Sequence, residues 1–209
     1  MYFCKKSFNV ARKSIKNSNI IIHTPLQFNE RLSLKYSANI YFKREDLQTV
    51  RSFKIRGAYY KILKHFKNRS SISISTCSAG NHAQGVAKTC NELNIKHTIF
   101  VPTSTPKQKI NRIKFFGGKY LDLQITGEDL QESMRESITY SNLNDSIFVH
   151  PYNDYDVILG QSTVAQEIYS ELTPNYIFSC DNILLHFVIL SPILLFQLLT
   201  VQFFVLLHL

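Results

Sequence analysis

The sequence predicts an α/β fold in which a parallel or mixed sheet has helices on both faces. Between residues 39 and 180, short stretches rich in β-branched and aromatic residues alternate with amphipathic stretches of helical length. The 209 residues, 44% of them hydrophobic, are enough for one ordinary domain or slightly more, with a sizeable core. Strands joined in this way by helices are typical of a parallel sheet.

The first half of the pattern contains two strands and two helices. Residues 38–43, ANIYFK, predict a strand, and a loop over residues 44–52 follows it. A helix is predicted over residues 53–66, because its apolar residues recur at the i, i+3, i+4, i+7 spacing of one helical face. Residues 71–76, SISIST, alternate polar and apolar side chains and predict a strand. A turn, SAGN, then leads into a helix over residues 82–93.

The second half continues the alternation from a strand at residues 97–102. The segment 104–118 is expected to form a helix with Thr105 as its N-cap, Pro106 at its first position and Gly117 past its end. The remaining expected elements are a strand at 119–125, a helix at 127–141, a strand at 146–151, a helix at 156–172 and a strand at 176–180. Ligands of such sheets bind beyond the carboxyl ends of the strands, so the loops after strands 38–43 and 71–76 are the candidate site.

The charge of the chain is positive but does not indicate a nucleic-acid partner. The formal net charge is +9, and all 24 lysines and arginines lie at or before Arg135. No run of basic residues is interleaved with aromatic ones, as it is in many nucleic-acid grooves. The favoured explanation of the positive charge is that these side chains lie solvated at the surface. The second explanation is that they bind a small ligand that carries phosphate. Glu45 and Asp46 are expected to fix their loop through Arg44 or Arg56.

The four cysteines and the N-terminal segment favour a reduced, cytoplasmic protein. No two cysteines have C-x-x-C spacing and no histidines have metal-ligand spacing, so neither a metal site nor a disulfide framework is predicted. The N-terminus has no apolar run that would form a secretory signal. Residues 4–19 are basic, contain serine and lack acids, which fits a transit peptide and equally well an AT-rich gene.

Lys54 lies at an unusual place for a lysine, in the first turn of the helix predicted over residues 53–66. The helix dipole disfavours a cation there and lowers the pKa of an amine. The position suggests a lysine that is needed as a neutral amine. A solvated surface lysine without a role is the alternative.

The segment CSAGNH, residues 77–82, follows a predicted strand and opens a helix. Backbone N–H groups and short polar side chains at a positive helix end can hold a carboxylate or a phosphate. A plain turn is the alternative, because serine, glycine and asparagine are common turn residues. Cys77 is expected to be buried packing rather than a nucleophile. Together with Lys54, an anion site suits an amino acid held by its carboxylate while an amine performs imine chemistry.

Four long collinear segments make the chain resemble the threonine dehydratase family of pyridoxal-phosphate enzymes, which includes serine dehydratases and serine racemase. They are YFKREDLQTVRSFKIRGAY, TCSAGNHAQGVA, VPTSTPKQKINRIKFFGG and GQSTVAQEI, and the resemblance runs from Thr24 to Phe178. It implies the fold of the tryptophan synthase β subunit, a pyridoxal 5′-phosphate cofactor, an amino-acid substrate and a homo-oligomer for the full-length protein.

The resemblance also implies roles for residues that match the family's motifs. Lys54 matches the lysine that forms the imine with the cofactor and then acts as a base, and Phe53 matches a residue beside the cofactor ring. Asn81 matches the asparagine that contacts the ring hydroxyl. The residues that match those holding the substrate carboxylate are Ser78, Ala79, Gly80 and His82.

The reaction implied by the resemblance is the β-elimination of water from L-threonine, which yields 2-oxobutanoate and ammonia. In this family that activity, threonine ammonia-lyase, is the first step of isoleucine biosynthesis. Serine racemase and serine dehydratase are the alternatives within the family.

The C-terminal segment departs from the family. Relatives have a glycine-rich loop for the cofactor phosphate after the strand that matches NYIF, whereas this chain has neither a glycine nor a charged residue after Asp181. We therefore expect an N-terminal extension at residues 1–22, a partial catalytic domain at 23–181 and a hydrophobic tail foreign to the family at 182–209.

Three explanations of the tail are open. A frameshift, an unspliced intron or a misplaced gene end is favoured by the abrupt change of composition. A membrane-spanning helix is less favoured, because Pro192 interrupts it and no basic residue flanks it. A buried helix is the third. A chain without the phosphate loop can also be an inactive, truncated module, associated with a membrane through its tail.

Overall fold

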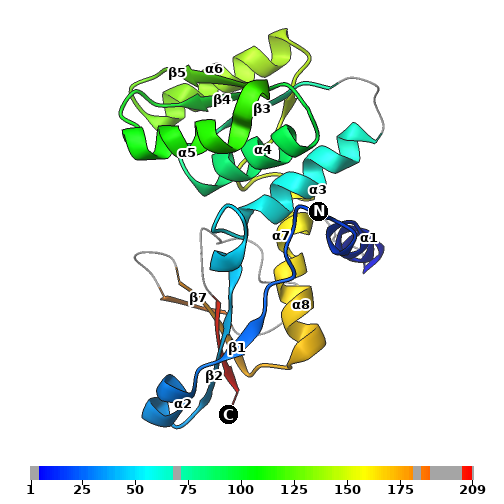
Figure 1. The fold of residues 1–209 in the computed structure, drawn as a ribbon, viewed down its shortest axis with the longest axis vertical. Helices are drawn as coiled ribbons and strands as arrows, with labels where there is room; N and C mark the ends of the chain where they lie inside the picture. The colour runs from blue at the N-terminus through cyan, green and yellow to red at the C-terminus, as the bar shows by residue number, and fades with distance from the viewer. Residues whose placement is uncertain (1–4, 68–71, 181–184, 189–203, 209) are drawn as a thin grey trace. The chain divides into compact units, whose positions relative to one another are not determined.

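The computed structural model describes residues 5–67, 72–180, 185–188 and 204–208 (Figure 1). The chain forms two compact units. The central unit is the continuous segment Lys54–Gly160, and the terminal unit combines Met1–Phe53 with Gln161–Leu209.

The central unit is built on a four-stranded parallel sheet with the strand order β5-β4-β3-β6. Its strands are β3 (Ile74–Cys77), β4 (His97–Val101), β5 (Leu121–Ile125) and β6 (Ile147–Phe148). Its helices are α3 (Lys54–Phe66), α4 (Asn81–Glu92), α5 (Lys107–Gly117), η2 (Gly118–Tyr120), α6 (Leu130–Leu143) and α7 (Tyr155–Gln161). Helix α6 lies on one face of the sheet, and α4 and α5 lie on the other (Figure 1). The predicted α/β class with helices on both faces is thus confirmed.

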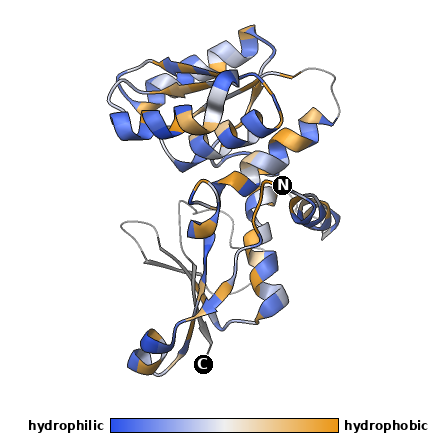
Figure 2. Cartoon of the chain, in the orientation of Figure 1, coloured by the Kyte–Doolittle hydropathy of each residue, from blue (hydrophilic) through white to orange (hydrophobic). Residues whose placement is uncertain are grey.

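The core of the central unit forms where the apolar faces of α3 and α4 meet the sheet. Its buried members are Ala58, Ile62, Ile74, Val86, Cys90, Ile95, Val149 and Val157. The helices of this unit carry hydrophilic residues beside hydrophobic ones, as expected for helices with one buried face (Figure 2). This packing fixes the starts of α3 and α4, where the candidate site residues lie.

The terminal unit has an antiparallel five-stranded sheet with the order β1-β2-β9-β7-β8. Its strands are β1 (Leu26–Phe28), β2 (Asn39–Lys43), β7 (Tyr176–Cys180), β8 (Leu185–Val188) and β9 (Phe204–His208). Its helices are α1 (Lys5–Lys16), α2 (Glu30–Tyr36), η1 (Glu45–Leu47) and α8 (Thr163–Glu171). A buried ion pair ties β2 to α8, because Lys43 Nζ lies 2.8 Å from Glu167 Oε2 and also donates to the carbonyl of Thr24.

Most predicted elements are present, but two predicted strands belong to another sheet. Residues 38–43 and 176–180 form β2 and β7, which lie in the antiparallel sheet of the terminal unit rather than in the parallel sheet. Paired strands can be far apart in sequence. A local alternation of residues therefore predicts a strand but not the strand with which it pairs. The sequence did not predict β1 and α2, nor the helix α1 within the expected N-terminal extension.

Three local predictions on helix ends need correction. The N-cap of α5 is Pro106 rather than Thr105, whose buried hydroxyl has no described hydrogen-bond partner. Gly117 is the last residue of that helix, and Gly118, at φ +56°, ends it. The helix expected over 156–172 is interrupted at Ser162, next to the boundary between the two units.

The KRED segment behaves as predicted for Asp46, which pairs with Arg44 at 2.8 Å. Glu45 accepts a hydrogen bond of 2.5 Å from the Thr24 hydroxyl. Both contacts hold the loop that leads from β2 towards α3.

The described parts of the expected tail, residues 185–188 and 204–208, are the strands β8 and β9. Two of the three explanations expected a helix there. The other residues of the expected tail, at 182–184, 189–203 and 209, lie outside the described residues. None of the helices in the described ranges is long and apolar enough to cross a membrane.

Candidate active site

The candidate site of the central unit gathers at the carboxyl ends of two neighbouring parallel strands. Strand β3 leads into the loop at residues 78–80, and β6 leads into the loop at residues 149–154. Ligands of open parallel sheets bind at this edge. The sequence predicted the first loop as part of the site and missed the second.

Lys54 is the first residue of α3, and its side chain is buried within the protein. It is 6% exposed, and its Nζ donates a hydrogen bond of 3.1 Å to the carbonyl of Pro151. The structure therefore excludes the alternative of a solvated surface lysine. No acidic residue lies in the first turn of α3, so the helix dipole acts on the amine without a local counter-charge from that turn.

Helix α4 packs against the start of α3 so closely that a side chain larger than that of glycine at residue 85 would be crowded. A Cβ on Gly85 would lie 3.1 Å from the backbone N and Cα of Ile55 and 3.2 Å from the carbonyl carbon of Lys54. Because these neighbours are backbone atoms, they cannot move aside as a flexible side chain can. The absence of a side chain at Gly85 thereby allows the backbone of Lys54 and Ile55 to lie close to α4.

The loop at residues 78–80 has the form of an anion site at a helix start. Its residues Ser78, Ala79 and Gly80 are partly exposed, and so is Asn81, where α4 begins. The Ser78 hydroxyl accepts a hydrogen bond of 3.3 Å from the Gly80 N–H, which closes the turn. A Cβ on Gly80 would meet nothing within 4 Å, so open space adjoins the loop. The first N–H groups of α4 and its dipole favour an anion in such a position.

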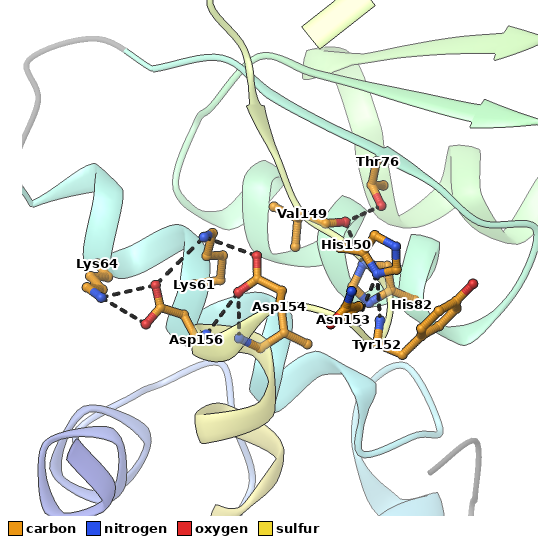
Figure 3. Close-up of polar contacts among 11 residues, drawn as sticks. Lys61, Lys64, Thr76, His82, Val149, His150, Tyr152, Asn153, Asp154 and Asp156 are labelled. Carbon is orange, nitrogen blue, oxygen red and sulfur yellow. Dashed lines mark hydrogen bonds and ion pairs between the residues drawn. The ribbon is translucent and has the colours of Figure 1, made fainter. Parts of the chain in front are cut away.

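The side chain of His82 does not join this anion site. It is 2% exposed, and its Nε2 lies 3.1 Å from the carbonyl of Val149 (Figure 3). Burial, and then the charge of Lys54, lower the pKa of His82 to about 3, so the ring is neutral near pH 7. What His82 can offer an anion is its backbone N–H in the first turn of α4.

The loop at residues 149–154 is fixed by its own polar residues. His150 Nδ1 accepts hydrogen bonds from the N–H groups of Tyr152 and Asn153, at 3.2 and 2.8 Å. Asp154 Oδ1 accepts from two N–H groups at the start of α7, and Asp154 also pairs with Lys61 of α3 at 3.0 Å (Figure 3). The signal that could have found this loop is its place after a predicted strand, at the edge that holds the first loop.

Two further residues singled out in the sequence, Phe53 and Cys77, are buried. Phe53 is 1% exposed and belongs to a cluster of the terminal unit that includes Val164 and Ile168. Cys77 is fully buried at the end of β3, and burial raises the pKa of its thiol to about 11. Such a thiol is unsuited to be a nucleophile, in agreement with the prediction of buried packing.

Comparisons with known proteins point to one family. A sequence model of the family described as "Pyridoxal-phosphate dependent enzyme" matches residues 18–180. Biosynthetic L-threonine dehydratase IlvA from Halalkalibacterium halodurans is 42% identical over 171 residues, which are 81% of this chain and 41% of that protein. The enzyme of the same name from Lactococcus lactis is 49% identical over 152 residues, covering 73% of this chain and 36% of that protein.

Solved structures give the same result. Threonine deaminase isoform 2 from Solanum lycopersicum, in its processed form, is similar with a TM-score of 0.72 and 34% identity, covering 82% of this chain and 47% of that one. Serine racemase from Dictyostelium discoideum has a TM-score of 0.72 and 26% identity, covering 81% of this chain and 54% of that one. The chain thus spans about two fifths of the length of these curated relatives and about half of these solved chains.

Proposed function

Because the chain belongs to the pyridoxal-phosphate dependent enzyme family, we propose that it carries the N-terminal part of a threonine ammonia-lyase. The reaction is the elimination of water from L-threonine to give 2-oxobutanoate and ammonia, the entry to isoleucine biosynthesis. The observation that carries the proposal is the buried amine of Lys54 at the carboxyl edge of the parallel sheet, in the same unit as the anion site at the start of α4. The names of the relatives support the choice of threonine.

The described residues fit pyridoxal 5′-phosphate at its reactive end. An imine between a lysine and the cofactor's aldehyde is protected from hydrolysis where water is excluded, and Lys54 is only 6% exposed. Open space adjoins Gly80, so the loop leaves room for a ligand. In our proposal Lys54 and Asn81 hold the cofactor and Phe53 contacts its ring, as in the motifs of the family. When bound, pyridoxal phosphate supplies an electron sink for the charge that forms at the substrate α-carbon.

The chain's own residues supply binding and proton transfer. The Ser78 hydroxyl and the N–H groups of Ala79, Gly80 and His82 hold the substrate carboxylate, and the positive end of α4 strengthens this contact. The Lys54 amine accepts the α-proton in its neutral form and is the base of the reaction. The 3.1 Å hydrogen bond to the Pro151 carbonyl orients the amine while it is free.

Two other readings rest on specific observations. Similarity to serine racemases supports serine as a second substrate class. The absence of glycine from the sequence after Gly160 supports a truncated, non-catalytic module, because the family's phosphate loop is rich in glycine. The division into an extension at 1–22, a partial catalytic domain at 23–181 and a tail at 182–209 is part of this proposal and is supported by the family match at 18–180. A homo-oligomer and a cytoplasmic location are proposed with it.

The test is to mix the purified chain with pyridoxal phosphate, reduce it with borohydride and map the labelled lysine by mass spectrometry. We expect label on Lys54 and little on Lys61, which is ion-paired with Asp154 in the same helix and serves as the internal control. Turnover of L-threonine and L-serine is then compared. Label spread over many lysines, or none, would support the truncated module instead.

A further inference from the structure

The loop that receives the Lys54 amine is held at its start by two side chains of the central unit. The carbonyl of Val149 accepts a hydrogen bond of 2.7 Å from the Thr76 hydroxyl and lies 3.1 Å from His82 Nε2 (Figure 3). Two residues later, the carbonyl of Pro151 accepts from Lys54 Nζ at 3.1 Å. We propose that Thr76 and His82 are positioning residues, which keep the Pro151 carbonyl where it holds the lysine amine. The proposal rests on the proposed function only in taking Lys54 as the reacting lysine.

The contacts at the Val149 carbonyl are buried and determine the state of the histidine ring. Thr76 and Val149 are fully buried, and His82 is 2% exposed. A carbonyl oxygen only accepts hydrogen bonds and has two lone pairs, so both are used by this pair of donors. His82 must therefore carry its proton on Nε2. Its Nδ1 is buried and has no hydrogen-bond partner among the described residues, which fits a ring that is held for its Nε2–H alone.

The far end of the loop is fixed independently. Asp154 caps α7 through the N–H groups of Asp156 and Val157, at 2.9 and 3.1 Å. Lys61 then ties Asp154 to α3, the helix that Lys54 begins. The segment with the Pro151 carbonyl is thus anchored on both sides. Loss of the anchor at Val149 is expected to release one side and leave the fold of the other intact.

The test measures the reactivity of the Lys54 amine without any cofactor. The full chain is exposed to a trace of acetic anhydride at a fixed pH, and acetylation of each lysine is measured by mass spectrometry. For His82→Leu we expect Lys54 acetylation to rise about fivefold, the ratio that corresponds to one net hydrogen bond of about 1 kcal/mol. His82→Gln is expected to restore the low value, because its amide places an N–H donor at a similar reach.

Matched substitutions separate positioning from general loosening. His97 is also buried and keeps one ring nitrogen without a described partner, but its other nitrogen pairs with the carbonyl of Ile95. His97→Leu should leave the acetylation of Lys54 unchanged. Thr76→Val removes the second donor to Val149 and should raise acetylation like His82→Leu. Thr89→Val removes a buried hydroxyl that has no described partner and should have no effect.

The outcomes are distinct from those for the proposed function. If His82→Leu and Thr76→Val leave the acetylation of Lys54 at the wild-type level, the positioning role is wrong. It is also wrong if the control substitutions at His97 and Thr89 raise the acetylation of Lys54 equally. Alkylation of Cys90, which is fully buried in the core of the central unit, reports unfolding of a variant. Failure of pyridoxal phosphate to label Lys54 would overturn the proposed function and leave the acetylation result unaffected.

Discussion

At the residue scale, His82 shows how a buried ring acquires one fixed chemical state. Burial, then the charge of Lys54, lower the pKa of His82 to about 3, although the hydrogen bond to the Val149 carbonyl acts in the opposite direction. The ring is therefore a neutral hydrogen-bond donor near neutral pH.

This state makes stability depend on pH in a defined direction. The unfolded chain takes up a proton on His82 near the ordinary pKa of about 6.5, and the folded chain does so only near 3. Folding is thus favoured above about 6.5, and stability falls as the pH drops from there towards 3. His97 and His150, whose pKa values burial also lowers, act in the same direction. Urea unfolding at pH 7, 6 and 5 should show that the free energy of unfolding falls less with decreasing pH for His82→Gln than for the wild type. An equal fall in both proteins would contradict the lowered pKa of His82.

The buried thiols provide a second prediction at this scale. Burial raises the pKa of Cys77 to about 11 and that of Cys90 well above its ordinary value. Iodoacetamide reacts with the thiolate, so both should be alkylated at pH 8 at least roughly 100-fold more slowly in the folded chain than in urea. Peptide mapping after timed alkylation measures this. Rapid modification of Cys77 in the folded chain would mean that the end of β3 opens or that the thiol has a reactive role.

At the scale of elements, local patterns predicted the helices and strands well, but not how they join. Apolar spacing predicted α3 to within one residue, since one buried face determines it. The end of α5 was misplaced by one residue, because Gly118 rather than Gly117 has the positive φ that ends the helix. The loop at residues 149–154 was missed because its importance comes from the Lys54 contact with Pro151, 97 residues away in sequence.

The close approach of α4 to α3 leads to a prediction about Gly85. Gly85→Ala would place a Cβ 3.1 Å from the Ile55 backbone, which must shift together with Lys54. Such overpacking is expected to lower the free energy of unfolding by about 1–3 kcal/mol. The matched control is Gly80→Ala, because a Cβ there meets nothing within 4 Å, so that only the loss of glycine as the N-cap of α4 is expected. Urea denaturation should show a smaller loss for this control than for Gly85→Ala, about 0.5–1 kcal/mol.

At the scale of the whole molecule, the motifs indicated the chemistry, whereas the assembly of the sheets could not be read from them. The segments with Lys54 and with residues 78–82 carry the family resemblance in consecutive residues, so a single sequence suffices to recognise them. Strand β9, which lies outside the residues that match the family, joins β2 and β7 into one antiparallel sheet. A segment outside the family match gives no family-based signal for its partner strands.

The two units also differ in what they require of the chain. The central unit is one continuous segment with its own sheet and buried cluster, whereas the terminal unit needs both ends of the chain to form its sheet. A fragment of residues 54–160 is therefore expected to fold alone, since its core contacts lie within it. Circular dichroism and urea denaturation would test this, with Lys54 acetylation as a local probe of the Pro151 contact. A cooperative transition with a shielded Lys54 would show that the amine is positioned by the central unit alone. An unfolded fragment would mean that the start of α3, with Lys54, depends on the terminal unit, whose sheet includes the C-terminal strands.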